Sequence, residues 1–267
     1  MLRHVLLEKR VGETPLMALQ NWKMANPVYD KVPASYAGRL DPMASGKLLI
    51  LLGEECKNQK QYTKLDKQYD IEVLIDVGSD TGDVLGIARY SGKETPVDNS
   101  VVREIIGREV GRHVRPYPHY SSKTVHGKPL FLHALMGQVH AVNVPTHEEH
   151  IYRIQLRDVT SLSSSELQNR ITEALSRVPI TDEPSKALGA NFRIDEVRTS
   201  WQEVFDEAHE RTFSILSLRV TCASGTYMRS LAERIGASLG THALALSIHR
   251  TKIGHYYPAL HYLHAIT

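Results

Sequence analysis

Alternation of apolar and polar residues constrains the fold of this chain more than any other feature. Residues 69–76 and 150–159 alternate with a period of two, which is typical of strands that bury one face. Residues 213–220 predict a further strand, and residues 48–53 form a short apolar run that predicts a buried segment. Neighbouring strands are often joined by short or non-helical connections, which suit antiparallel pairing. The sequence therefore predicts the α+β class with a largely antiparallel sheet, not a doubly wound parallel sheet.

Helical spacing appears between these strands, in residues 14–25, 101–110, 163–178 and 225–239. Thr14 is a candidate cap for the first helix and Pro15 occupies its first position. Residues 26–46 are rich in Pro, Gly, Ser and Asp and predict a loop. Residues 180–200 predict a surface insertion.

Composition limits the classes of protein to consider. With 267 residues, 42% hydrophobic and 23% charged, the chain can bury a core, and we expect one domain over residues 1–267. A formal charge of +2 means that a nucleic-acid partner requires basic residues gathered on one face. Cys56 and Cys222 predict no disulfide framework, which favours a reducing, cytoplasmic compartment. We expect no membrane span, because no apolar stretch of about 18 residues occurs.

Asp41 lies in a segment with two interpretations. Asp-Pro followed by small residues and Gly46 is typical of a surface turn. The apolar run that follows would instead anchor the carboxylate on a rigid neighbour, as a catalytic loop requires. Tyr69, at the start of a strand, is similarly either an edge residue of the core or a functional side chain. Asp80 lies in a turn-rich stretch whose spacing lacks the twelve-residue ligand loop of a calcium site.

Arg229 follows a strand that ends in Ser224-Gly225-Thr226, where a helix begins. The N–H groups of a helix N-terminus suit phosphate, but a cation there opposes the helix dipole. Arg229 therefore needs a neighbouring anion or must face water. His147 and His150 are three residues apart in a predicted loop, so we expect no zinc site. No P-loop, GxGxxG or GxSxG motif supports a nucleotide-binding or hydrolase function.

The ordered set of segments resembles the TruB family of tRNA pseudouridine synthases over roughly residues 5–263. The family's Gly-His-Thr-Gly-Thr-Leu-Asp-Pro pattern corresponds to the segment around Asp41, and its Lys-x-Tyr strand to Lys67-Gln68-Tyr69. The other matching segments are Ser79-Asp80-Thr81-Gly82-Asp83, Tyr120-Ser121-Ser122-Lys123, Gly225-Thr226-Tyr227-Met228-Arg229 and Ile248-His249-Arg250-Thr251. The resemblance implies the pseudouridine synthase fold, a mixed and mainly antiparallel sheet flanked by helices.

Three positions depart from the family pattern. Tyr36 replaces the family histidine before the nucleophile, and Ile248 replaces a leucine. The lysine of the Tyr-Ser segment is displaced by one position to Lys123. The chain ends soon after the resemblance, so we expect no C-terminal RNA-binding domain of the PUA type.

The resemblance implies a role for each matching residue. Asp41 would be the nucleophile, held ionised by Arg229, and Asp80 would complete their charge network. Tyr69 would stack on the flipped uracil and assist removal of its C5 proton, and Ile248 would line the pocket. The expected RNA contacts are Tyr36, Arg39, Lys123, Lys128 and Arg250. No metal or cofactor is implied.

The expected activity is therefore isomerisation of the T-loop uridine of tRNA, position 55, after base flipping by a cytoplasmic monomer; an organellar location stays open. A rival function is that of a chaperone that folds tRNA by binding its T-arm. A synthase that acts on another RNA and a binding module that takes no RNA are two further candidates. Retention of Asp41 disfavours simple RNA binding, because a carboxylate near a phosphate backbone is repelled.

Overall fold

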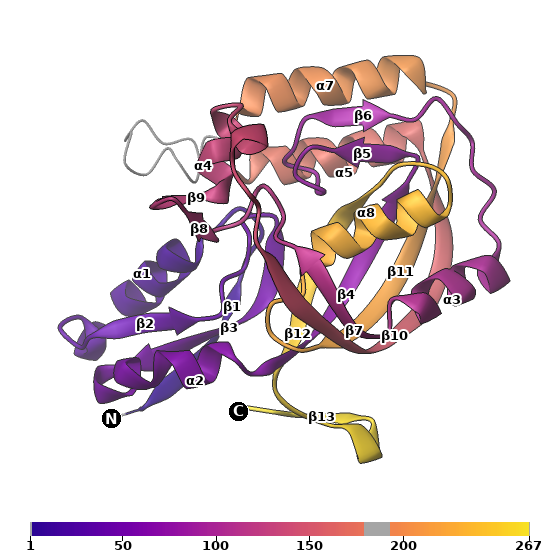
Figure 1. Cartoon of the computed structure of the whole chain (residues 1–267). Coiled ribbons are helices and arrows are strands. Elements are labelled where there is room, and N and C mark those ends of the chain that lie inside the picture. Colours follow the sequence, from indigo (N-terminus) through magenta and orange to yellow (C-terminus); the bar gives the residue numbers. More distant parts are fainter. Residues whose placement is uncertain (1, 179–192, 267) are drawn as a thin grey trace.

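The computed structural model describes residues 2–178 and 193–266, and a nine-stranded sheet dominates it (Figure 1). Seven strands follow the order β1-β3-β12-β4-β11-β10-β7, while β2 pairs with β3 and β13 pairs with β12. The strands are β1 (His4–Lys9), β2 (Ala34–Ala37), β3 (Ala44–Leu52), β4 (Asp66–Ile75), β7 (Gly111–Pro116), β10 (Thr146–Ser163), β11 (Thr212–Cys222), β12 (Ala243–Tyr257) and β13 (Tyr262–Ala265). Two small hairpins pair β5 (Val77–Ser79) with β6 (Ala88–Tyr90) and β8 (Thr124–Val125) with β9 (Lys128–Pro129).

The pairing confirms the predicted class. Among the described strands, β3 and β12 form a parallel pair, in which Ile248 lies opposite Ala44, and the other pairs are antiparallel. The helices are α1 (Pro15–Ala25), α2 (Gln59–Thr63), α3 (Asn99–Arg108), α4 (Leu130–Leu135), α5 (Ser164–Ser176), α7 (Ile194–Glu207) and α8 (Met228–Ser238). Short 3-10 turns are η1 (Pro27–Tyr29), η2 (Gly53–Asn58), η3 (Val139–Ala141) and η4 (Pro258–Leu260). No helix in the described ranges is long and apolar enough to cross a membrane.

Local signals set the predicted helix starts. The hydroxyl of Thr14 accepts a hydrogen bond from the Met17 backbone N–H, and Pro15 opens α1. Ser163 and Glu166 form a reciprocal capping box at the start of α5. The helix predicted over residues 225–239 begins only at Met228, because Gly225 has a positive φ of 95° and Tyr227, which precedes the helix, is extended.

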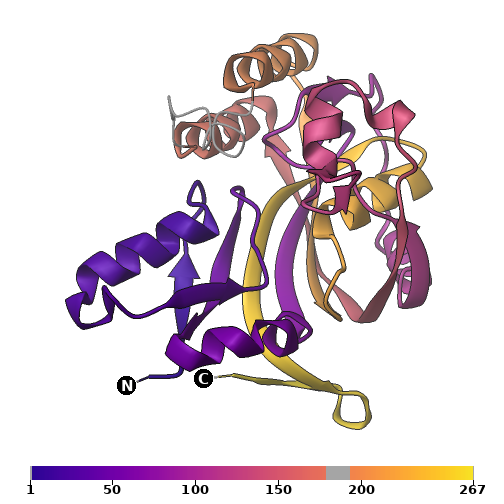
Figure 2. The same cartoon turned by 60° about the vertical axis from the view of Figure 1, so that its left-hand side comes forward.

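Burial of β3 on both faces explains its continuous apolar run. Leu48, Ile50 and Leu52 pack in one cluster with Ala18 and Leu19 of α1. Leu49 and Leu51 point into a second cluster, with Leu65. Figure 2 shows β1–β3 with α1 and α2 on one side of the long strands β4 and β12, and α4 and α8 on the other. The strand that begins three residues after Asp41 is therefore rigidly held.

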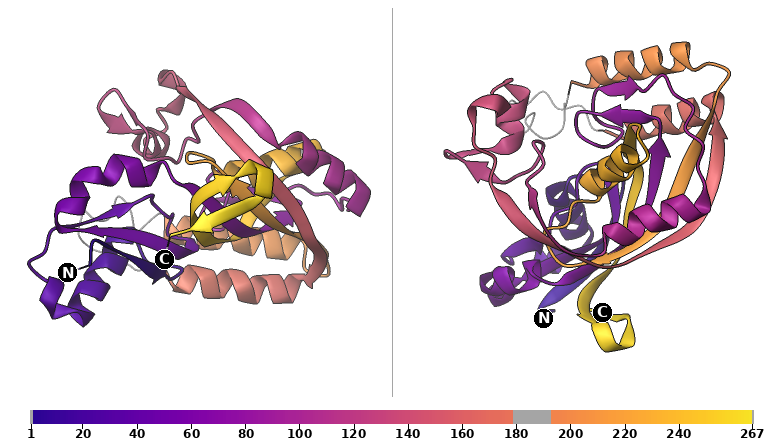
Figure 3. Two further views of the ribbon diagram at one scale, coloured as in Figure 1. Left: turned by 90° about the horizontal axis from the view of Figure 1, so that it is seen from below. Right: turned by 45° about the vertical axis from the view of Figure 1, so that its right-hand side comes forward.

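The main core lies where the curved sheet wraps around α8, as Figure 3 shows, and it also takes in α3, α5 and α7. Its members from α8 include Leu231 and Ile235, which are fully buried against strands β4 and β12. A helix buried on one face in this way is held by packing more than by propensity. The N-terminus of α8 is consequently a fixed point of the molecule.

The prediction that residues 26–46 form a loop is wrong in part, and part of the predicted 180–200 insertion is helical. Residues 34–37 of the predicted 26–46 loop form β2, whose Tyr36 lies opposite Ile50 of β3. Cross-strand pairing, which a four-residue segment cannot signal locally, decides this. Of the predicted 180–200 insertion, residues 180–192 lie outside the described residues. Residues 194–200 belong to α7, where Val197 and Ser200 are buried.

Replacement of Trp201 by Ala tests whether α7 belongs to the core. Trp201 is 1% exposed, and its indole N–H donates to the Val84 carbonyl over 3.0 Å. We expect Trp201→Ala to lower the free energy of unfolding in urea by roughly 3–5 kcal/mol. The neighbouring exposed Gln202→Ala should change it by less than about 0.5 kcal/mol. Equal effects of the two changes would contradict the packing of α7.

Candidate active site

An ion pair between Asp41 and Arg229 forms the centre of the site. Asp41 lies on the loop between β2 and β3, and Arg229 is the second residue of α8. The Nε of Arg229 donates to Oδ2 of Asp41 over 2.8 Å. The Arg229 side chain is 5% exposed, whereas that of Asp41 is 45% exposed. The carboxylate is therefore accessible to solvent, whereas the cation that it contacts is buried. Asp41 is the neighbouring anion that Arg229 was predicted to need.

Arg229 is fixed by further contacts. Its two terminal nitrogens donate to the carbonyls of Thr81, over 2.7 Å, and Tyr120, over 3.0 Å. The buried carboxylate of Asp83 lies 3.5 Å from its Nε. Burial alone would lower the pKa of Arg229, but Asp41 and Asp83 raise it above the ordinary value. The guanidinium is thus charged and has a single orientation.

Asp83, rather than the predicted Asp80, lies against Arg229. The Asp83 carboxylate is turned inward because its Oδ1 accepts from the Thr81 hydroxyl, over 2.8 Å, and the Leu85 N–H, over 2.9 Å. Burial raises the pKa of Asp83, and Arg229 opposes that rise. Nothing in the local sequence distinguishes the two aspartates of this turn, since both are flanked by small or apolar residues.

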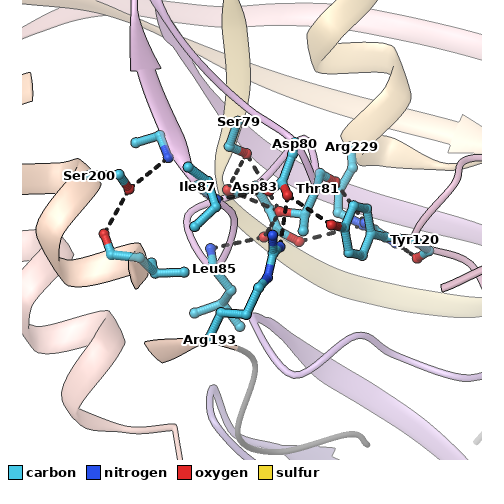
Figure 4. Close-up of polar contacts among 12 residues, drawn as sticks. Ser79, Asp80, Thr81, Asp83, Leu85, Ile87, Tyr120, Arg193, Ser200 and Arg229 are labelled. Atoms are coloured by element: carbon cyan, nitrogen blue, oxygen red, sulfur yellow. Dashed lines mark hydrogen bonds and ion pairs between the residues drawn. The ribbon is translucent and has the colours of Figure 1, made fainter. Parts of the chain in front are cut away.

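Asp80 contacts Tyr120 and Arg193 beside the Arg229 guanidinium (Figure 4). Its Oδ2 accepts from the Tyr120 hydroxyl over 2.8 Å and from Arg193 over 2.7 Å. The guanidinium of Arg193 also lies over the Tyr120 ring, 5.3 Å from its centroid. The Asp80 side chain is thus connected to Arg229 by way of Tyr120, whose carbonyl Arg229 contacts, and it helps to hold Tyr120 in place.

A cavity of about 260 Å³ opens beside Asp41. Tyr69 and Ile248, both predicted site residues, line it together with Lys67 and the loop 223–227. Burial raises the pKa of Tyr69, and the Arg250 guanidinium opposes this. The Tyr69 phenol is consequently neutral near pH 7. Tyr227 is a second aromatic wall, and burial together with Tyr117 and Asp41 raises its pKa to about 12.

The prediction that Arg250 binds phosphate is wrong. Arg250 is 1% exposed, and it donates to the carbonyls of Lys47, over 2.7 Å, Gly38, over 3.0 Å, and Arg39, over 3.3 Å. Its three contacts bind one end of the Asp41 loop to β12 and β3. Sequence alone could not show this, because the partners are backbone atoms more than 200 positions away.

Lys9 holds the other end of the same loop. It is fully buried, and its Nζ donates to the carbonyls of Ala44, over 2.5 Å, and Pro42, over 3.4 Å. Burial lowers the pKa of Lys9 to about 8. The loop that carries Asp41 is thus bound on both sides by buried cations.

Three of the cations that the sequence predicted as RNA contacts are exposed, and one of them, Arg39, lines the cavity. Arg39 is exposed and donates to the Ser122 hydroxyl over 2.9 Å. Lys123, just before β8, and Lys128, on β9, are both exposed. The Lys123 Nζ lies 5.1 Å from the centroid of the Tyr117 ring. Tyr36 lines a neighbouring hollow, not the cavity around Tyr69. The described residues contain no group of three or more His, Cys, Asp or Glu that could hold a metal ion.

Lys67 is a cavity residue that the sequence assigned no separate role. It lies two positions before Tyr69 on β4, and a period of two could have indicated that both share one face. Its Nζ donates to the Thr63 carbonyl over 2.8 Å and to the Leu65 carbonyl. Burial, with Arg250 as a second cause, lowers its pKa from 10.5 to about 8.

Arg250→Met tests whether Arg250 holds the Asp41 loop in place. Removal of a buried cation that satisfies three carbonyls should lower the free energy of unfolding by on the order of 3 kcal/mol. The matched change Arg39→Met, at an exposed arginine of the same loop, should stay within about 0.5 kcal/mol. Equilibrium unfolding in urea measures both. A small effect of Arg250→Met would show that the loop holds without it.

Lys67 gives the stability a pH dependence with a defined sign. Between its folded pKa of about 8 and the ordinary 10.5, the unfolded chain binds more protons than the folded one. Stability therefore rises with pH in this window. We expect wild type to gain about 3 kcal/mol relative to Lys67→Met between these two pH values. If the difference in stability between wild type and Lys67→Met stays constant over this pH range, burial does not lower the pKa of Lys67.

Comparisons with known proteins identify the family of this chain. Residues 28–173 match the family described as TruB family pseudouridylate synthase (N terminal domain). The chain is 29% identical over 250 residues to tRNA pseudouridine synthase B of Burkholderia mallei (strain NCTC 10247). The matched region covers 94% of this chain and 64% of that protein. The corresponding protein of Bordetella pertussis (strain Tohama I) is 27% identical over 252 residues, 94% of this chain and 80% of that protein. The chain thus spans less than two thirds of the Burkholderia relative.

Solved structures share the fold. Superposition on a chain of a Cbf5-Nop10-Gar1 complex gives a TM-score of 0.54 at 17% identity, over 94% of this chain and 48% of that one. A chain of an archaeal box H/ACA sRNP Nop10-Cbf5 complex gives 0.50 at 16% identity, over 94% and 47%. At this identity, the likeness concerns the fold alone. Since the family match covers more than half of its residues, the chain belongs to the TruB family of pseudouridylate synthases.

Proposed function

We propose that this chain isomerises a uridine of tRNA, position 55 in the T-loop, to pseudouridine, with Asp41 as the nucleophile. The observation that carries the proposal is the half-exposed Asp41 carboxylate, held 2.8 Å from the buried Arg229 at the edge of a cavity. The names of the TruB relatives supply the substrate class. An aspartate fixed in this way is suited to covalent catalysis.

The proposed reaction moves the uracil without net oxidation or hydrolysis. The bond between N1 and the ribose C1′ breaks, a bond between C5 and C1′ forms, C5 loses its proton and N1 gains one. Asp41 forms the transient covalent bond that keeps the substrate on the enzyme while the base turns. Arg229 orients the carboxylate and balances its charge before the attack and after release.

Tyr69 is proposed to stack on the base. Its raised pKa keeps the phenol protonated near neutral pH, which favours stacking and hydrogen-bond donation over removal of the C5 proton. Ile248, 5% exposed, would bound the cavity and position the ring. Because the cavity is recessed, the target nucleotide must leave its stack to enter.

The RNA contacts are proposed for the exposed cations Arg39, Lys123 and Lys128. Arg39 lies on the Asp41 loop and lines the cavity, whereas Lys123 and Lys128 follow Ser121 and Ser122, which also line it. Contacts of this kind to phosphates carry affinity and make it depend on salt. We further infer that the chain binds the T-arm of tRNA as a monomer. Its free Cys56 and Cys222 support a reducing, cytoplasmic location.

Asp41→Asn tests the activity and the nucleophile together. We expect wild type to form pseudouridine at the T-loop uridine of a tRNA transcript. Asn keeps the shape of the side chain but is a poor nucleophile, so Asp41→Asn should lower the rate by a factor of at least roughly 10³. The matched control Asp195→Asn, at a side chain 93% exposed on α7, should remain fully active.

Binding and product formation, measured together, distinguish the rival functions. Tight binding of tRNA by wild type and Asp41→Asn, without product from either, would favour a tRNA-folding chaperone or a different RNA substrate. Product from both proteins would exclude Asp41 as the nucleophile.

A further inference from the structure

We propose that His147, on β10, is a positioning residue that holds the cavity wall formed by residues 223–227. Through this loop it fixes Tyr227, which lines the cavity, and Arg229, which pairs with Asp41. The inference rests on the proposed function. The loop links β11 to α8 and belongs to neither, so contacts from other segments must set its conformation.

The imidazole of His147 has one defined orientation. Its Nε2 lies 3.0 Å from the Gly225 carbonyl oxygen and 3.4 Å from Oε1 of Glu149. Both neighbours are acceptors, so Nε2 carries the proton and donates to the loop. The side chain is 9% exposed, and its Nδ1 is buried without a hydrogen-bond partner among the described residues. His147 thus offers a single donor, aimed at the carbonyl of a glycine whose φ is 95°.

Two aromatic rings enclose this imidazole. Tyr117 stacks on it, with ring centroids 4.1 Å apart and an interplanar angle of 22°. The Tyr227 ring meets it edge-on, at 5.7 Å and 86°. Stacked and edge-to-face rings of this kind attract one another. His147 therefore contacts the cavity wall twice, through the Gly225 carbonyl and through the ring of Tyr227.

Glu149 extends the support to the helix that carries Arg229. Helix α8 has no side-chain cap from the described residues, and a cation in its first turn opposes the helix dipole. The Glu149 carboxylate, 2% exposed, accepts from the Tyr227 N–H over 3.4 Å and lies 3.3 Å from Arg234 of the same helix. A buried anion at the helix N-terminus offsets both deficits. Because this carboxylate also lies beside Nε2 of His147, the two side chains act as one unit.

Other groups hold the first half of the loop. The Ser224 hydroxyl donates to the Thr63 carbonyl over 2.7 Å, and the Ala223 N–H donates to a carbonyl of β10 over 2.8 Å. Both contacts lie before the glycine, so the half that leads to Arg229 depends on His147 and its carboxylate neighbour. We expect loss of His147 to leave the fold in place while the arginine loses its fixed orientation.

Two replacements of His147 separate the hydrogen bond from the volume of the ring. In His147→Gln, the amide nitrogen takes the place of Nε2 and can still donate to the loop. His147→Leu fills the space but cannot donate. Thr146→Leu, at an exposed residue of the same strand, is the matched control. For each protein, kcat and KM are measured on a tRNA transcript, and unfolding in urea gives the folded fraction.

We expect His147→Leu to lower kcat between about 10- and 100-fold and to leave KM within about twofold, because a small displacement of catalytic groups slows the chemical step. His147→Gln should recover kcat to within about threefold of wild type, since one donor is restored. Thr146→Leu should match wild type. A role in the fold alone would lower the midpoint of unfolding and leave kcat per folded molecule unchanged.

The inference is overturned if His147→Leu and wild type have the same kcat per folded molecule, or if His147→Gln is no better than His147→Leu. Both outcomes leave the proposed function standing. Absence of pseudouridine from wild type would instead remove the proposed function.

Hydrogen exchange tests the positioning without reference to activity. Amides of the peptide that covers residues 223–229 should exchange about fivefold faster in His147→Leu than in wild type, the effect of one lost hydrogen bond. His147→Gln should resemble wild type. Equal exchange in all three proteins would show that His147 does not hold the loop, whether or not the protein acts on tRNA.

Discussion

The buried guanidinium of Arg229 is the constraint on which the site depends. A cation that is 5% exposed needs compensating groups, and here four groups supply them: the carboxylates of Asp41 and Asp83 and the carbonyls of Thr81 and Tyr120. They come from three separate segments, because Thr81 and Asp83 belong to the same turn. Each group offsets part of the desolvation of one arginine and is itself positioned by it. Asp83 takes the inner side, and Asp41 is left half exposed at the edge of the cavity.

Rigidity of the Asp41 loop comes from two buried cations. Lys9 and Arg250 are almost fully buried, and they bind the loop through its carbonyls at opposite ends. The loop continues into β3, which is buried on both faces. A surface turn is thus converted into a fixed support for a carboxylate, as nucleophilic catalysis requires. The same arrangement explains why Arg250, which was predicted to contact RNA, has a structural role.

The two hollows follow from the position of this loop. It separates the cavity around Tyr69, formed by β4 and the β11–α8 connection, from the hollow beneath α1 and α4. Asp41 lines both spaces. Tyr36, at the position of a family histidine, lines the hollow beneath α1 and α4, whereas Tyr69 lines the first cavity.

The sequence by itself determined the class of fold, the strands with period-two alternation, the capped helices at Thr14 and Ser163, and the segments that carry Asp41, Tyr69 and Arg229. These features are local, because they depend on the spacing of neighbours along the chain. Only the tertiary structure decided that Asp83 instead of Asp80 balances Arg229, that Arg250 and Lys9 clamp the loop, that β2 is a strand and that residues 194–200 belong to a core helix. Each of these depends on partners distant in sequence, often backbone carbonyls, and on burial, which fixes whether a charged side chain meets water or must be satisfied within the protein.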